Sequence, residues 1–67
     1  MKIKYFEDTD TALMEFSDHR VSETREINEN FYIDLDGQGN VAAVTVEHAS
    51  AQANMREMAF QRITAEG

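Results

Sequence analysis

Apolar and polar residues alternate along the first two thirds of the chain, and this alternation is typical of β-strands with one buried face. Polar turns separate five such runs, which are residues 2–6, 13–16, 21–27, 31–35 and 41–46. The run 21–27 has little to bury, which predicts an edge strand or a strand covered by a partner. Gly37 and Gly39 make the turn before residue 41 the strongest hairpin signal, because glycine takes the positive φ that tight turns require.

The pattern changes after His48. Ser50 can cap a helix through its hydroxyl, the following residues are good helix formers, and apolar residues recur at helical spacing. We therefore predict one C-terminal helix over residues 50–63 and a frayed tail at 64–67. The predicted fold class is α+β, a single small domain in which an antiparallel β-meander of four to five strands (residues 2–47) precedes this helix.

The predicted helix carries more apolar surface than one of its sides can bury. Met55, Met58 and Ile63 share one stripe, whereas Phe60 lies off it. A helix with apolar groups on more than one side must bury more than one side, and methionine adapts to varied partner surfaces. We predict that Met55, Met58, Phe60 and Ile63 form the interface of a homodimer; the alternative is packing within one chain.

The composition supports self-association. The chain has 67 residues with 13 acidic and 6 basic side chains, a net charge of −7, and no cysteine. A domain of roughly 60 residues buries only about 60% of the surface that its unfolded chain exposes. Small domains gain further stability from disulfides, a structural metal or oligomerisation, and the lack of cysteine excludes the disulfides.

Charge and hydropathy exclude other classes of partner. Residues 1–36 hold ten acidic and four basic side chains, a net charge of −6. Affinity for a phosphate backbone comes from clustered lysine and arginine, so we expect no direct nucleic-acid binding. No apolar run has the length of a signal peptide or a membrane span, so we expect a cytoplasmic protein with no membrane contact.

Two patterns raise the question of a metal. Residues 34–41 resemble the start of an EF-hand loop, but Thr45 stands where a bidentate Glu must complete the calcium site. Turn chemistry explains the same residues more simply. His19 and His48 each have an acidic neighbour, but their spacing does not require a shared site, and we interpret both as surface residues. We therefore expect no metal and no cofactor.

The acidic pairs do not indicate catalysis. Asp34 and Asp36 have the i, i+2 spacing that places both on one strand face, opposite the face of the apolar residues. We interpret them as solvent-facing residues. The sequence has no nucleophile elbow, and so short a chain leaves little room for a substrate cavity. We predict that the protein is not an enzyme and has no catalytic residue.

A family resemblance covers residues 1–50. The residues that carry it are Met1 to Tyr5, Asp10 to Met14, Glu26, Asp34 to Asp36, Gly39, Val41, Ala49 and Ser50. In these positions the chain resembles the short bacterial and phage proteins of the domain-of-unknown-function 2283 family. The resemblance implies a compact antiparallel sheet and assigns no activity. The chain departs from the family pattern after Val41, where an expected acidic residue is missing, and in the segment after Ser50.

These observations lead to two hypotheses of function. The first is a small, acidic, non-catalytic protein-binding module that self-associates to finish its core. The alternative is an acidic inhibitor of the phage or mobile-element type, which would occupy a basic nucleic-acid-binding surface of an enzyme or defence complex. The acidic first half motivates the alternative, because a negative field steers association with positive clefts.

Overall fold

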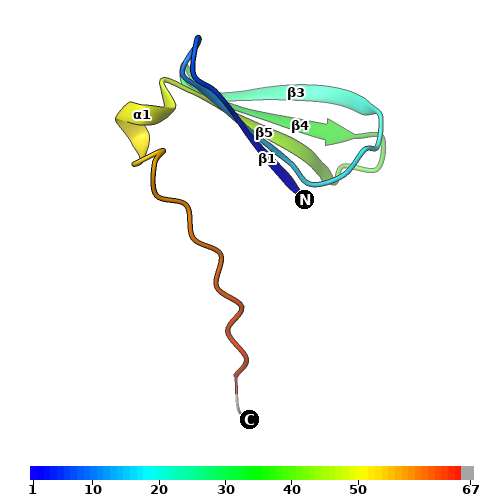
Figure 1. Cartoon of the computed structure of the whole chain (residues 1–67). Helices are drawn as coiled ribbons and strands as arrows, with labels where there is room; N and C mark the ends of the chain where they lie inside the picture. The colour runs from blue at the N-terminus through cyan, green and yellow to red at the C-terminus, as the bar shows by residue number, and fades with distance from the viewer. Residues whose placement is uncertain (66–67) are drawn as a thin grey trace.

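A computed structural model describes residues 1–65 and shows a mostly β fold (Figure 1). Five strands form one antiparallel sheet in the order β1-β2-β5-β4-β3, and a single helical turn follows them. The elements are β1 (Lys2–Phe6), β2 (Thr11–Glu15), β3 (Val21–Asn28), β4 (Phe31–Asp36), β5 (Val41–Glu47) and α1 (Ala49–Gln52). No helix in this part of the chain has the length and hydrophobicity needed to cross a membrane.

The strand order corrects the predicted meander. The strands β3, β4 and β5 do follow one another as antiparallel neighbours, but β2 pairs with β5 instead of β3. The last strand therefore lies in the centre of the sheet, and β1 and β3 form its edges. The reason is visible in the side chains: all eight residues of β3 are exposed, whereas β5 contributes Ala42, Ala43, Val44 and Val46 to the buried set. The predicted edge position of β3 is confirmed.

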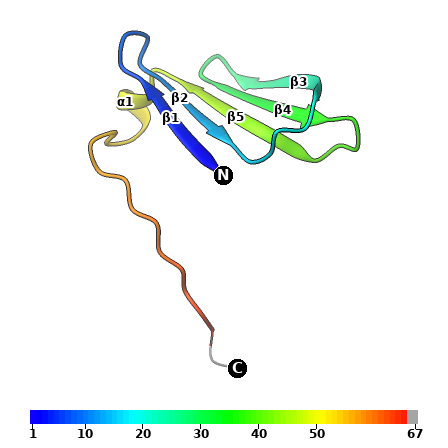
Figure 2. The ribbon, with the colours of Figure 1, turned by 45° about the vertical axis from the view of Figure 1, so that its right-hand side comes forward.

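The predicted helix over residues 50–63 is wrong in its length. Helix α1 ends at Gln52, and Ala53 has extended dihedral angles (φ −153°, ψ 161°). Residues 53–65, here called the C-terminal arm, run away from the sheet after a turn at 54–57 (Figures 1 and 2). Isolated helices of this length are marginal in water without tertiary packing, so favourable propensity alone did not make one. Part of the predicted frayed tail, residues 66 and 67, lies outside the described residues.

The strand register divides the sheet into two faces. Ile3 lies opposite Met14, Met14 opposite Val44, and Val44 opposite Ile33, so these side chains share one face. The residues of this apolar face are Ile3, Tyr5, Ala12, Met14, Phe31, Ile33, Val44 and Val46. The polar face carries the charged residues Lys2, Lys4, Glu15, Glu26, Asp34 and Glu47. Helix α1 packs on the apolar face through Ala49.

The turn between β4 and β5 supplies a test of the fold. Gly39 has φ +84°, a conformation that costs other residues about 1–2 kcal/mol. Gly39→Ala should therefore lower the free energy of unfolding by about that amount in urea titrations. Gly37→Ala is the matched control, because Gly37 is outside the left-handed region and an added Cβ would contact nothing within 4 Å. Equal effects of the two substitutions would contradict the turn geometry.

Candidate functional site

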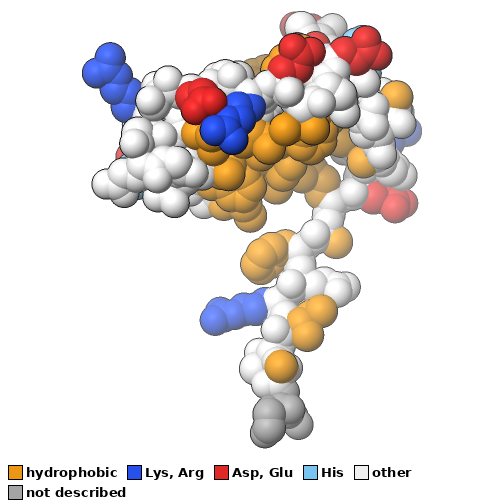
Figure 3. All heavy atoms as spheres, turned by 180° about the vertical axis from the view of Figure 1, so that it is seen from behind, with side chains coloured by type: hydrophobic (Ala, Val, Ile, Leu, Met, Phe, Trp, Pro, Cys, Tyr) orange, Lys and Arg blue, Asp and Glu red, His pale blue; other side chains and the backbone are white. Residues whose placement is uncertain are grey.

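The apolar face of the sheet is only partly covered, and it is the candidate site. Helix α1 and the side chain of Met55 pack over one end of it, against Ala12, Val44 and Val46. Beyond that end the face stays open: Ile3 is 45% exposed, and Met14 is only half-buried. A space-filling view from behind shows this open surface as a continuous hydrophobic area (Figure 3).

A groove of about 290 Å³ lies between the open face and the first part of the C-terminal arm. Ile3, Met14 and Phe31 line it from the sheet, and Met55 and Met58 line it from the arm. Its walls are mostly apolar side chains, so it suits an apolar side chain better than a polar substrate.

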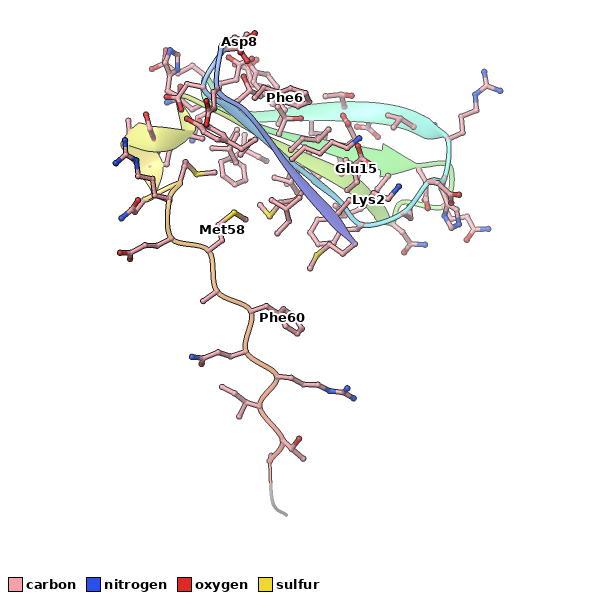
Figure 4. All side chains as sticks on the ribbon, in the orientation of Figure 1. Lys2, Phe6, Asp8, Glu15, Met58 and Phe60 are labelled. Carbon is pink, nitrogen blue, oxygen red and sulfur yellow. The ribbon has the colours of Figure 1, made fainter. Side chains whose placement is uncertain are left out.

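The structure splits the predicted interface of Met55, Met58, Phe60 and Ile63. Met55 packs against the core cluster of its own chain, and Met58 lines the groove while remaining 57% exposed. Phe60 and Ile63 are 81% and 84% exposed. In Figure 4 Met58 lies beneath the sheet, and Phe60 lies further along the arm and clear of it. Of these four residues, only Met55 packs against the core of its own chain, as the alternative of packing within one chain predicted.

A contact between distant residues holds α1 on the apolar face. Asp10, at φ 55° in the β1–β2 turn, accepts hydrogen bonds from the backbone N–H of Ser50 (3.0 Å) and from its hydroxyl (2.6 Å). The Tyr5 hydroxyl donates to the same carboxylate, and the Asp10 carbonyl accepts from the N–H of Ala49 (2.9 Å). Asp10 thus satisfies two free amides at the start of the helix, that of Ser50 through its carboxylate and that of Ala49 through its backbone carbonyl, a role usually taken by the preceding residue.

Sequence reasoning missed this contact. It assigned the cap to the Ser50 hydroxyl, which instead donates to Asp10, and the residue before the helix, His48, makes no side-chain cap within the described chain. The only signal was that Asp10 and Ser50 both belong to the residues that carry the family resemblance. The hydrogen bonds from Ser50 and then from Tyr5 lower the pKa of Asp10, and the bond to Asp10 raises the pKa of Tyr5.

Asp36 is buried, with 7% of its surface exposed, which corrects its predicted solvent-facing position. Its Oδ1 accepts hydrogen bonds from the N–H groups of Gln38 and Asn40 (both 2.9 Å), and its Oδ2 lies 3.1 Å from Nδ1 of His19. The contact with His19 is the largest cause of a lowered pKa at Asp36, followed by the Asn40 amide. The carboxylate is therefore engaged by its own hairpin turn, in agreement with the turn interpretation.

The remaining chemical candidates are dispersed. Asp34 and Asp36 have separate partners: the Thr24 hydroxyl donates to Asp34 (2.7 Å), whereas Asp36 contacts His19 and the amides of its own turn. His48 contacts the side chain of Asn30 (2.9 Å), whereas His19 contacts Asp36, so the histidines have different partners. Within residues 1–65 no three His, Asp or Glu side chains are grouped to hold a metal ion.

The match to a protein family covers the whole sheet. Residues 2–50 match the family described as "Protein of unknown function (DUF2283)". The chain belongs to the DUF2283 family. The DUF2283 match contains both partners of the Asp10–Ser50 contact and ends before the C-terminal arm, so the resemblance seen in the sequence is confirmed. No curated protein and no solved structure matches the chain.

The two engaged carboxylates predict how stability depends on pH. Because folding lowers the pKa of Asp10 and of Asp36, each stabilises the fold above its usual pKa, and the contribution is lost as pH falls through the lowered value. The urea midpoint should therefore fall between about pH 5 and pH 2. Asp10→Asn and Asp36→Asn should each lower the midpoint at pH 7 and flatten this dependence.

Asp8→Asn is the matched control for lost charge, because it removes an exposed carboxylate from the same turn as Asp10. The two tested variants should lose more stability at pH 7 than this control. Asp10→Asn and Asp36→Asn midpoints that follow the wild-type pH curve would contradict the assigned hydrogen bonds.

Proposed function

We propose that this DUF2283 protein is a non-catalytic interaction module that self-associates and binds protein through its apolar sheet face. The observation that supports the proposal most directly is the missing second layer. Stable domains pack a sheet face against another sheet or against helices. Among residues 1–65 only α1 and Met55 cover this face, and no large side chain is fully buried.

The surface area gives the same indication. The chain exposes 5694 Å² of accessible surface. A compact monomer of 7.6 kDa exposes about 4,300 Å², so the excess is about 1,400 Å². A stable protein–protein interface buries about 800 Å² on each partner. The excess is therefore large enough for such an interface.

The distribution of charge is compatible with association of like chains. Although the net charge is −7, none of the residues that β1, β2, β4 and β5 place on the apolar face is charged. The nearby charges are Glu57, which lines the groove from the arm, and the ion pair of Arg25 and Glu23 on β3 (2.8 Å). Two such sheet faces can meet through uncharged side chains with these charges at the margin, as in interfaces with an apolar centre and a polar rim.

The alternative, an acidic inhibitor of a basic nucleic-acid-binding surface, receives less support. Such an inhibitor needs a continuous negative surface. Here Lys2 and Lys4 share the polar face with the acidic residues, and Lys4 is paired with Glu15 (2.9 Å). The polar face therefore carries basic residues on β1 and is not a continuous negative surface.

The proposal predicts a mass that rises with concentration. In sedimentation equilibrium the mass should approach twice the 7.6 kDa of one chain. Ile3→Lys should weaken the dimer about 10- to 100-fold, because it replaces an apolar side chain at the interface by a charge. Phe6→Lys is the matched control: it changes a similarly exposed apolar residue (49% against 45%) on the same strand but on the opposite face.

Phe6→Lys should leave the mass unchanged. A chain that stays at 7.6 kDa up to millimolar concentration would remove self-association from the proposal. A dimer weakened equally by both variants would place the contact elsewhere.

A further inference from the structure

The edges of the sheet are poorly suited to a second copy. Strand β3 has two register shifts and carries charged residues, including Glu23 and Arg25. Strand β1, at the other edge, is only five residues long and carries Lys2 and Lys4. Bulges, short length and edge lysines all oppose the addition of another strand. The apolar face and the C-terminal arm are therefore better suited to self-association than the sheet edges.

The groove on that face lacks an occupant within the described chain. Its walls come from the sheet and from Met55 and Met58, which lie at the start of the arm. Past Met58 the arm leaves its own sheet, so Phe60 lies beyond the groove that the preceding residues help to form (Figure 4). Phe60 and Ile63 are also the most exposed of the large apolar residues, at 81% and 84%.

We infer that the C-terminal arm of one chain seats Phe60 in this groove on a second copy, and that the second chain returns the same contact. The inference rests on the proposed self-association and names the residues that carry it. A reciprocal exchange of this kind is closed by a two-fold axis, because each chain supplies both the groove and the side chain that fills it.

Charge is compatible with the same arrangement. Residues 1–52 hold eleven acidic and four basic side chains, a net charge of −7, whereas residues 53–67 hold two acidic and two basic side chains and are neutral. A neutral arm can lie on a second acidic copy without the repulsion that two acidic surfaces would have. The affinity of this contact comes from apolar burial.

Two complementary variants test the exchange. Phe60→Ser removes the inserted side chain, and Ile3→Lys damages the groove; each should raise the dissociation constant of its homodimer about 10- to 100-fold. In an equimolar mixture, the intact arm of the Ile3→Lys chain can enter the intact groove of the Phe60→Ser chain. The mixed dimer loses one of its two contacts instead of both, so it should form about 3- to 10-fold more tightly than either variant homodimer, measured by sedimentation with one variant carrying a fluorophore.

The outcomes separate this inference from the proposed function. A mixture no tighter than its components, or a Phe60→Ser chain that dimerises like the wild type, overturns the exchange and leaves self-association standing. A wild-type chain that never dimerises overturns both. Circular dichroism of each variant checks that the sheet is intact.

A second measurement does not depend on a damaged groove. A photoreactive benzoylphenylalanine replaces Phe60 in the full chain, and ¹⁴N- and ¹⁵N-labelled chains are mixed before irradiation. Mixed-isotope cross-links from position 60 to peptides containing Ile3 or Met14 support the exchange, and cross-links within single chains only overturn it. The same group at position 6, on the polar face, is the control and should give no such product.

Discussion

A β-sheet with one apolar face requires a second layer, because only burial of that face offsets the entropy lost in ordering the strands. In this chain the requirement is met at one end alone. Helix α1 covers Ala12, Val44 and Val46, and the strongly buried side chains there are small. Larger apolar side chains of the same face, among them Met14 and Phe31, remain half-buried beside α1. The open face, the exposed arm and the excess surface all follow from this incomplete layer.

The Asp10–Ser50 contact determines how far the cover extends. It ties the first residues of α1 to the β1–β2 turn, and so places Ala49 over one end of the apolar face. The DUF2283 match ends at the same point. Helix α1 ends at Gln52, and beyond Met55 the large apolar residues of the arm are exposed. The part of this chain that matches the family thus builds an open sheet, and we propose that the segment after it covers that sheet on another molecule.

Much of this fold could be predicted from local pattern. Alternation located all five strands, and the polar sequence of β3 indicated its place at an edge. The central position of β5 was missed because strand pairing is non-local. Strands β2 and β5 pair although about thirty residues separate them, and the local sequence of neither strand indicates its partner. Asp36 was misplaced because alternation along a strand does not report contacts made by the following turn: the amides of Gln38 and Asn40 donate to its carboxylate, and His19 lies beside it.

The candidate site could be predicted less completely. The apolar residues of the arm were identified, but their helical spacing was mistaken for a helix. The spacing shows which side chains would share one side of a helix, but a short helix also needs a surface against which that side can pack. The helix cap was missed because its acceptor, Asp10, lies forty residues away from Ser50. Contacts of that separation depend on the completed fold.

In the proposed dimer a second chain covers the apolar face. Isotope-filtered NMR on a mixture of labelled and unlabelled chains detects such a contact. We expect intermolecular NOEs to the methyl groups of Met14, Ile33 and Val44 at concentrations where the mass is that of a dimer. NOEs to these methyl groups that arise only within one chain, in a molecule that tumbles as a 7.6 kDa monomer, would contradict it.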